Sequence, residues 1–349
     1  MKSVYVQDIH KVEVHDDTPI REPEGDEILM RVEYAGICGS DLHLYNGVHP
    51  FRKPPIIVGH EMSGVVAKTG PEATQYKEGD RVTAMPMQSC LECDACGRGL
   101  GWFCKERKLP GMDGWPGSFV AFWYIREPFV FKLPDELDTK TAVLAEPATI
   151  AYHSLDRVPP ENRKNLLIMG AGAIGTLSIL VAKAMGFEKI ITTDVVQYNL
   201  DRSPEFGADA AIQVKDGYEG LDAAVDEIFG EARATAIYVT AGGDMDILQK
   251  ACRYCGVRST IVVIPPIVSP PATVILNDLV AKEISVVGAV NYGLKDFAAT
   301  LDIIARRKEA FQKVITHCFE LDAAQEAFDF AARGKEGHFK VAIRFPEQD

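Results

Sequence analysis

Residues 165–194 constrain the fold of this chain of 349 residues more than any other segment. The apolar run NLLIM, typical of a strand buried on both faces, leads directly into GAGAIG at 170–175 and then into a helical pattern. A second strand pattern follows and ends at Asp194, 24 residues after the first glycine. This order of strand, glycine-rich turn, helix, strand and acid predicts a parallel α/β sheet that binds a dinucleotide.

Each glycine of the turn has a physical role in such a site. Gly170 makes the turn, Gly172 admits the pyrophosphate at the helix N-terminus, and Gly175 lets the helix pack on the strand. The intervening residues of the expected cofactor-binding turn are Ala173 and Ile174.

Asp194 is the candidate ligand of the adenosine ribose. Its carboxylate would accept hydrogen bonds from the ribose hydroxyls and repel a 2′-phosphate, which favours NAD over NADP. The alternative is an aspartate that only caps a turn at the strand end.

Strands and helices continue to alternate to about residue 289, which predicts a doubly wound parallel sheet. Ala241, in Ala241-Gly242-Gly243, follows a strand end, where open α/β sheets bind ligands. We therefore expect it beside the nicotinamide half of the cofactor. Cys252 and Cys255 lie at the end of a predicted helix, where core thiols are expected and a redox pair is the alternative.

Residues 1–35 alternate apolar and polar side chains, which predicts an all-β beginning. The loops that follow carry a thiol, two imidazoles, a hydroxyl and two carboxylates within 24 residues: Cys38, Ser40, Asp41, His43, His60 and Glu61. Thiolate, imidazole and carboxylate are the ligands of a catalytic zinc site, which keeps one position open. The alternative is a buried cysteine with two surface histidines.

Two further stretches bear on metal binding. Four thiols lie within 15 residues, at Cys90, Cys93, Cys96 and Cys104, and such crowded thiolates need a cation between them. A closed tetrahedral zinc site of structural type meets that need, although the ligand type alone does not exclude an iron–sulfur cluster. Glu146 precedes a predicted helix in an apolar setting, where either a metal or the helix N-terminus would be its partner.

The composition narrows the possible partners. A formal charge of −13 argues against nucleic acid and against an anionic membrane surface. The N-terminus shows no signal peptide, and no apolar run approaches the roughly 20 residues that cross a bilayer. Eight cysteines in such a chain are expected as metal ligands or core thiols, which favours a cytoplasmic enzyme.

Jointly, these motifs resemble the medium-chain dehydrogenase/reductase superfamily in its zinc-dependent alcohol and polyol dehydrogenase branch. They are GICGSDLH at 36–43, GHE at 59–61, the cysteine lobe at 90–104, EP at 146–147 and GAGAIG at 170–175. The EP pair, with no cysteine there, resembles the sorbitol, threonine and sugar-acid dehydrogenase group.

The resemblance implies a GroES-like β-rich catalytic domain at 1–155 and 290–349, interrupted by a Rossmann domain at 156–289. It further implies NAD, one catalytic and one structural zinc ion, an active site between the domains, and a homodimer or homotetramer formed through the Rossmann sheet edge. The implied reaction oxidises a secondary hydroxyl of a polyol, sugar alcohol or sugar-derived substrate to a ketone. The alternatives are an amino alcohol or simple alcohol as substrate, a zinc-free reductase, and a nucleotide-binding protein without turnover.

By the same resemblance, Cys38 and His60 bind the catalytic zinc, and either Glu61 or Glu146 supplies the third protein ligand. Ser40 would pass the substrate proton outward and His43 would deliver it to solvent, unless they are only a turn hydroxyl and a surface imidazole. Other expectations concern Tyr45, Phe51 and Trp115 as candidate pocket residues, Pro265-Pro266 as a departure near the nicotinamide, and Lys340 as a solvated side chain.

Overall fold

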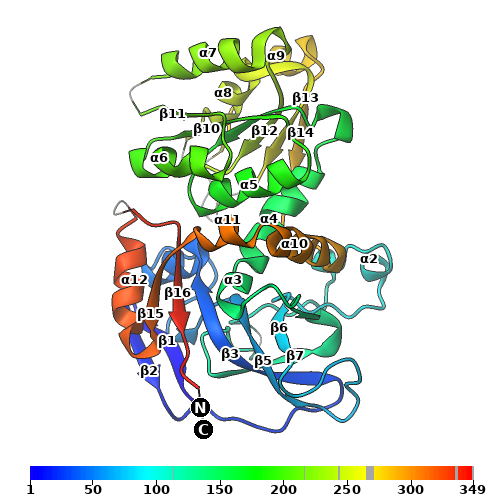
Figure 1. The fold of residues 1–349 in the computed structure, drawn as a ribbon, viewed down its shortest axis with the longest axis vertical. Helices are drawn as coiled ribbons and strands as arrows, with labels where there is room; N and C mark the ends of the chain where they lie inside the picture. Colours follow the sequence, from blue (N-terminus) through cyan, green and yellow to red (C-terminus); the bar gives the residue numbers. More distant parts are fainter. Residues whose placement is uncertain (113, 216, 243, 265–270, 335–336, 348–349) are drawn as a thin grey trace. The chain divides into compact units, whose positions relative to one another are not determined.

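The computed structural model describes residues 1–349 apart from 113, 216, 243, 265–270, 335–336 and 348–349. The chain packs as two compact units, Met1–Pro147 with Tyr292–Asp349, and Ala148–Asn291 (Figure 1). The sequence placed the first boundary after residue 155, whereas the division falls at Pro147, inside helix α4 (Ala145–Asp156). Among the described residues, no helix is both long and apolar enough to cross a bilayer.

The first unit is rich in β-strands, as the alternating N-terminal pattern predicts. Its strands are β1 (Ser3–Asp8), β2 (Lys11–His15), β3 (Glu27–Ile37), β4 (Ile56–Ile57), β5 (Glu61–Thr69), β6 (Arg81–Ala84), β7 (Phe122–Arg126), β8 (Val130–Lys132), β15 (Ile315–Glu320) and β16 (Lys340–Arg344). One sheet has the order β2-β1-β4, and a seven-stranded sheet has the order β15-β16-β3-β5-β6-β8, with β7 also paired to β3. The C-terminal segment thus joins the first unit, because β16 pairs with β3.

Short helices connect the strands of the first unit. They are α1 (Gly39–Tyr45), α2 (Asp94–Gly97), α3 (Thr139–Ala142), α10 (Leu294–Arg306), α11 (Lys308–Gln312) and α12 (Ala324–Ala332). The sequence analysis expected Ser40 and His43 in a loop, and this was wrong, because both lie on α1. Asp41 stabilises the start of this helix. Its carboxylate accepts a hydrogen bond from the Cys38 N–H and so closes a capping box.

The second unit is a six-stranded parallel sheet with the order β11-β10-β9-β12-β13-β14. Its strands are β9 (Asn165–Met169), β10 (Lys189–Asp194), β11 (Ala210–Gln213), β12 (Ala234–Val239), β13 (Cys255–Val263) and β14 (Ser285–Gly288). Its helices are α5 (Ala173–Ala184), α6 (Gln197–Phe206), α7 (Glu219–Ala224, continued by a π-helical turn Val225–Phe229), α8 (Ile247–Tyr254) and α9 (Leu276–Ala281). The strand order reverses beside β9, which is the topology of a doubly wound dinucleotide-binding fold.

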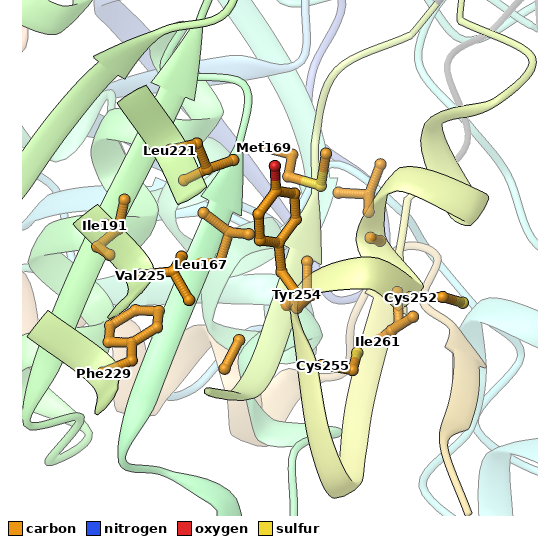
Figure 2. Close-up of a cluster of buried hydrophobic side chains, with 14 of the residues drawn as sticks. Leu167, Met169, Ile191, Leu221, Val225, Phe229, Cys252, Tyr254, Cys255 and Ile261 are labelled. Carbon is orange, nitrogen blue, oxygen red and sulfur yellow. The ribbon is translucent and has the colours of Figure 1, made fainter. Parts of the chain in front are cut away.

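Buried apolar side chains from β9, β10, β12, β13 and the adjacent helices α7 and α8 form the core on one side of this sheet (Figure 2). Cys252 and Cys255 belong to this core and are 1% and 0% exposed. Burial raises the pKa of Cys252 and raises that of Cys255 to about 12, so both thiols stay protonated and unreactive. They are core thiols, as the sequence analysis expected, and not a redox pair.

Candidate metal and cofactor sites

The pairing of β3 with β5 brings the first group of candidate ligands together. Gly36 of β3 lies opposite Glu61 of β5, so Cys38, just after β3, comes beside His60, just before β5. One ligand atom each of Cys38, His60 and Glu61 lies within 4.8 Å of the others. Gly59, the residue before His60, has φ +100°, a backbone conformation that favours glycine.

Asp41 holds this geometry from behind. Its Oδ2 accepts from the Cys38 N–H at 3.0 Å, its Oδ1 accepts from the Gly59 N–H at 3.3 Å, and the same Oδ1 lies 3.9 Å from His60 Nδ1. Burial raises the pKa of Asp41, and the His60 charge opposes that rise. One carboxylate therefore ties together both segments that carry the ligands.

Glu61 is buried, and its two oxygens have different surroundings. Oε1 accepts from Lys340 Nζ at 2.6 Å, while Oε2 has no hydrogen-bond partner among the described residues. A Cβ at Gly36 would lie 2.2 Å from Oε2, so only glycine there leaves room for it. A buried carboxylate oxygen without a partner beside a thiol and an imidazole fits a metal ligand.

Lys340 was expected in solvent, and this was wrong. It is 3% exposed and donates to Ile37 O at 3.3 Å as well as to Glu61. Burial would lower the pKa of Lys340, but the charges of Glu61, Cys38 and Glu146 together with the hydrogen bond to Glu61 raise it, so the ammonium stays charged. The sequence around Lys340 does not predict its burial, because its partner Glu61 lies 279 residues away in the sequence.

Glu146 lies in the first turn of α4, rather than before the helix as expected. It does not belong to the group formed by Cys38, His60 and Glu61, and its Oε1 accepts from the Tyr292 hydroxyl at 2.7 Å. Burial raises the pKa of Glu146, the charge of His60 opposes that rise and that of Glu61 adds to it. Glu146 is thus within electrostatic reach of the group without sharing its closest contacts, and Tyr292 is a neighbour that the sequence analysis missed.

His60 shows how the charges of this group balance. Burial would lower the pKa of its imidazole, but Cys38, Asp41 and Glu146 together raise it well above its ordinary value. Several acidic groups thus converge on a single imidazole. A divalent cation would neutralise them, so the residues present fit a catalytic zinc ion.

The remaining members of the predicted catalytic set lie on α1. Ser40 and His43 are three residues apart on this helix, so their side chains lie on the same face. The Nδ1 atom of His43 is buried and has no hydrogen-bond partner among the described residues.

The four cysteines of the 90–104 lobe also converge. The Sγ–Sγ distances are 3.8 Å for Cys90–Cys96, 3.5 Å for Cys93–Cys96 and 3.5 Å for Cys104–Cys90. A tetrahedron with Zn–S bonds of ~2.3 Å has edges of ~3.8 Å, so the lobe fits a zinc ion. The N–H groups of Glu92 and Cys93 lower the pKa of Cys90 to about 7, whereas the neighbouring thiols raise the pKa of Cys93 to about 11, so the sulfurs of this lobe titrate as one interacting group.

The glycine-rich turn of the second unit shows why two of its glycines are required. Gly170 has φ +113°, and a Cβ there would lie 2.5 Å from Thr240 Oγ1. A Cβ at Gly175 would lie 1.9 Å from Gly170 O, so α5 could not approach β9 as it does. A Cβ at Gly172 would meet nothing within 4 Å, which leaves the helix N-terminus at Ala173 and Ile174 open to a phosphate.

Asp194 ends β10 beside this turn. Its Oδ2 accepts from the Ala171 N–H at 2.8 Å and from Asn199 Nδ2 at 3.1 Å, and its Oδ1 accepts from the Val196 N–H at 2.9 Å. These three donors fix the carboxylate at the C-terminal edge of the sheet. Asn199 is a supporting residue that the sequence analysis did not identify.

Ala241 lies at the same edge, because its N–H donates to Met169 O at 2.9 Å. It is thus a neighbour of Gly170. Three of the residues expected near the nicotinamide, Gly243, Pro265 and Pro266, lie outside the described residues.

Of the three candidate pocket residues, Tyr45 was wrongly assigned. It is 1% exposed, and its hydroxyl donates to Asp329 Oδ1. Trp115 lines a cavity of about 300 Å³ in the first unit, where its ring stacks on Trp123 at 4.7 Å. None of the predicted metal ligands lines that cavity, whereas Phe51 is 80% exposed on the loop between the ligands.

The whole chain is similar to known dehydrogenases. The alcohol dehydrogenase GroES-like domain family matches residues 24–135, and the zinc-binding dehydrogenase family matches residues 173–306. The sorbitol dehydrogenase of Bombyx mori is 32% identical over 322 residues, covering 90% of this chain and 91% of that protein. The 2-dehydro-3-deoxy-L-galactonate 5-dehydrogenase of Pseudoalteromonas atlantica is 32% identical over 285 residues, 81% of each chain.

Among solved structures, an alcohol dehydrogenase of Escherichia coli CFT073 in complex with NADH has a TM-score of 0.87. It is 28% identical and covers 99% of both chains. The chain therefore belongs to the zinc-binding, GroES-like alcohol dehydrogenase family of medium-chain dehydrogenases, with a GroES-like domain and a Rossmann domain. It is an enzyme, a dehydrogenase that depends on zinc and NAD and acts on a CH–OH group.

Proposed function

We propose that the enzyme oxidises a secondary hydroxyl of a polyol, sugar alcohol or sugar-derived substrate to a ketone, reversibly and with NAD as hydride acceptor. The observation that supports the chemistry is the convergence of Cys38, His60 and Glu61 within 4.8 Å. The similarity to a sorbitol dehydrogenase and to a sugar-acid dehydrogenase, each at 32% identity, supports the substrate class.

In this proposal the catalytic zinc is held by Cys38, His60 and Glu61, with Glu146 close enough to exchange with Glu61 or to act through water. When bound, zinc supplies a Lewis acid that lowers the pKa of the substrate hydroxyl, and NAD supplies the acceptor for the hydride. Asp41 positions Cys38 and His60 through the hydrogen bonds described above.

The proton of the substrate leaves along α1. Ser40 takes it first, and His43 then receives it through its unpartnered nitrogen and releases it to solvent. In the second unit, Gly172 and the N-terminus of α5 hold the pyrophosphate, while Asp194 binds the adenosine ribose and disfavours a 2′-phosphate. Zinc at Cys90, Cys93, Cys96 and Cys104 has a structural role, because the four sulfurs leave no open position.

The direct test is NAD reduction with a panel of hexitols, pentitols and sugar acids. We expect turnover with wild-type enzyme and a loss of at least a thousandfold in the Cys38→Ser variant, with an unchanged circular dichroism spectrum. Full activity in that variant would eliminate the zinc mechanism. Turnover of simple alcohols or threonine alone would reject the proposed substrate class.

We further propose that the enzyme is a cytoplasmic homo-oligomer. All eight cysteines are free, which suits a reducing compartment. Strand β14 is the edge of the six-stranded sheet, and exposed apolar side chains lie on it and on α9, including Val286 (42% exposed) and Val280 (74% exposed). An edge strand of this kind favours pairing with a second copy of the chain, as in a dimer or a tetramer built from dimers.

A further inference from the structure

Asp194 joins three segments at the C-terminal edge of the parallel sheet. Ala171 of the glycine-rich turn and Val196, the residue before α6, donate to it through their N–H groups at 2.8 Å and 2.9 Å. Asn199, in the first turn of α6, donates to it through Nδ2 at 3.1 Å. Asn199 is thus the one residue of the described chain whose side chain donates to this carboxylate.

The two oxygens of Asp194 differ in the number of hydrogen bonds that they can still accept. Oδ2 accepts from both Ala171 and Asn199, whereas Oδ1 accepts only from Val196 within the described ranges. A carboxylate oxygen has two lone pairs, so Oδ2 is fully used and Oδ1 retains one. An adenosine ribose presents two neighbouring hydroxyls, and Asp194 held in this way can accept from one of them.

The amide of Asn199 offers the acceptor that Asp194 lacks. Its Nδ2 is bound to Asp194, while its Oδ1 accepts no hydrogen bond from any residue that the structure describes. An amide oxygen is an acceptor with two lone pairs, and it lies beside the nitrogen of the same planar group. Asp194 and Asn199, joined by one hydrogen bond, therefore present two acceptors, one on each side chain.

The charge of this pair of side chains favours a neutral ligand. The three donors to Asp194 are two backbone N–H groups and an amide, so they do not neutralise its carboxylate. Arg202, the basic residue of α6, pairs instead with Glu205 at 3.1 Å. The carboxylate therefore repels an anion, whereas a hydroxyl can donate to both side chains.

We propose that Asn199 is a second ligand of the adenosine ribose: it holds Asp194 through Nδ2 and accepts one ribose hydroxyl through Oδ1, while Asp194 Oδ1 accepts the other. This inference rests on the proposed function, which assigns Asp194 to the ribose, and adds a residue to that site. Asn199 thereby contributes to the preference for NAD. A 2′-phosphate would replace one of the two hydroxyls that the pair binds and would bring an anion to the carboxylate.

The test is a cycle that combines a change in the protein with a change in the ligand. ADP, 2′-deoxy-ADP and 3′-deoxy-ADP are titrated by calorimetry into wild-type enzyme and into Asn199→Leu. In the wild type, the loss of either hydroxyl should raise Kd about fivefold or more, the effect of one hydrogen bond. In Asn199→Leu, Kd for ADP should rise about fivefold, and one deoxy analogue should then bind as tightly as ADP, within about twofold. The other analogue should still bind more weakly, because Asp194 keeps its two backbone donors.

Gln197→Leu is the matched control, because it removes an amide of the same helix that donates to Asp201 and not to Asp194. We expect it to change Kd less than twofold for all three nucleotides. Asn199→Ala is a second variant, which should repeat the pattern of Asn199→Leu without the bulk of a leucine side chain. Thermal melting without nucleotide, followed by circular dichroism, shows that each variant is folded.

The outcomes separate this inference from the proposed function. If Asn199→Leu retains both losses of affinity for the deoxy analogues, Asn199 does not touch the ribose and the inference fails. If it abolishes both, Asn199 only positions Asp194, and the role as a second ligand fails. In either case the assignment of Asp194 stands. Wild-type enzyme that binds all three nucleotides equally well, with no change of cofactor preference in Asp194→Gly, would count against the proposed ribose site itself.

Discussion

At the residue scale, Glu61 depends on a single cation of the protein. Its carboxylate is buried, with Oε1 on Lys340 and Oε2 directed at the space that Gly36 leaves. A buried carboxylate that loses its partner is strongly destabilising, because its desolvation is no longer compensated. Lys340 therefore holds Glu61 in position and compensates its buried charge.

We expect Lys340→Met to lower the free energy of unfolding of the zinc-free enzyme by about 3–5 kcal/mol, since methionine keeps the volume and removes the cation that compensates Glu61. Urea denaturation followed by tryptophan fluorescence measures this. Adding Glu61→Gln to that variant should recover most of the loss, because the buried carboxylate that had lost its cation is then removed. A loss below about 1 kcal/mol in the single variant would show that the ion pair is not needed.

The proposed role of Asp194 in cofactor choice also belongs to the residue scale. Asp194→Gly should raise the ratio of kcat/KM for NADP to that for NAD at least tenfold, because a 2′-phosphate no longer meets a carboxylate. Asp194→Asn is the control, since it removes the charge and keeps an acceptor for the Ala171 and Val196 N–H groups. If neither variant changes the ratio in initial-rate assays, Asp194 does not bind the ribose.

At the scale of elements, we expect two glycines of the turn between β9 and α5 to have different roles, Gly175 in the stability of the fold and Gly172 in NAD binding. Gly175→Ala should reduce the free energy of unfolding by about 3 kcal/mol, because its Cβ would overlap Gly170 O. Gly172→Ala should leave stability unchanged, since that Cβ meets nothing, yet weaken NAD binding at least tenfold by blocking the pyrophosphate.

Thermal denaturation and NADH fluorescence titration measure the two effects. Equal stability losses in both variants would contradict this division of roles between the two glycines.

Local patterns predicted most of these elements. The buried strand β9, the glycine-rich turn and β10 follow from composition and order alone, and the cysteine spacing predicted the convergence of the 90–104 lobe. Helix α6 and strand β11 were not predicted, because Pro204 lies inside α6 and every residue of β11 remains partly exposed. Helix α1 was mistaken for a loop, since its capping box has cysteine rather than serine or threonine at the N-cap position.

At the scale of the whole molecule, contacts between distant segments escaped prediction. Lys340 and Tyr292 come from the C-terminal part of the chain, and reach Glu61 and Glu146 only because that part returns to the first unit. No local pattern encodes such pairings. The residue types of the metal ligands, in contrast, were recognisable from the sequence because few other arrangements tolerate them together.

Assembly is a further property at this scale. We expect Val286→Lys to convert the oligomer to monomers in light scattering after size exclusion, because a charge on β14 opposes pairing of two sheet edges. Ser285→Asn, an uncharged substitution at an exposed position of the same strand, serves as the control and should leave the mass unchanged. An oligomer of unchanged mass in Val286→Lys would place the interface elsewhere.

The measurement that tests the central claim most directly is the number of zinc atoms per chain, by mass spectrometry, in wild-type enzyme and in Cys38→Ser. The account predicts two in the wild type, and one in the variant, which keeps only the metal of the cysteine lobe. Two zinc atoms in Cys38→Ser, or a wild-type enzyme that turns over with one, would contradict it.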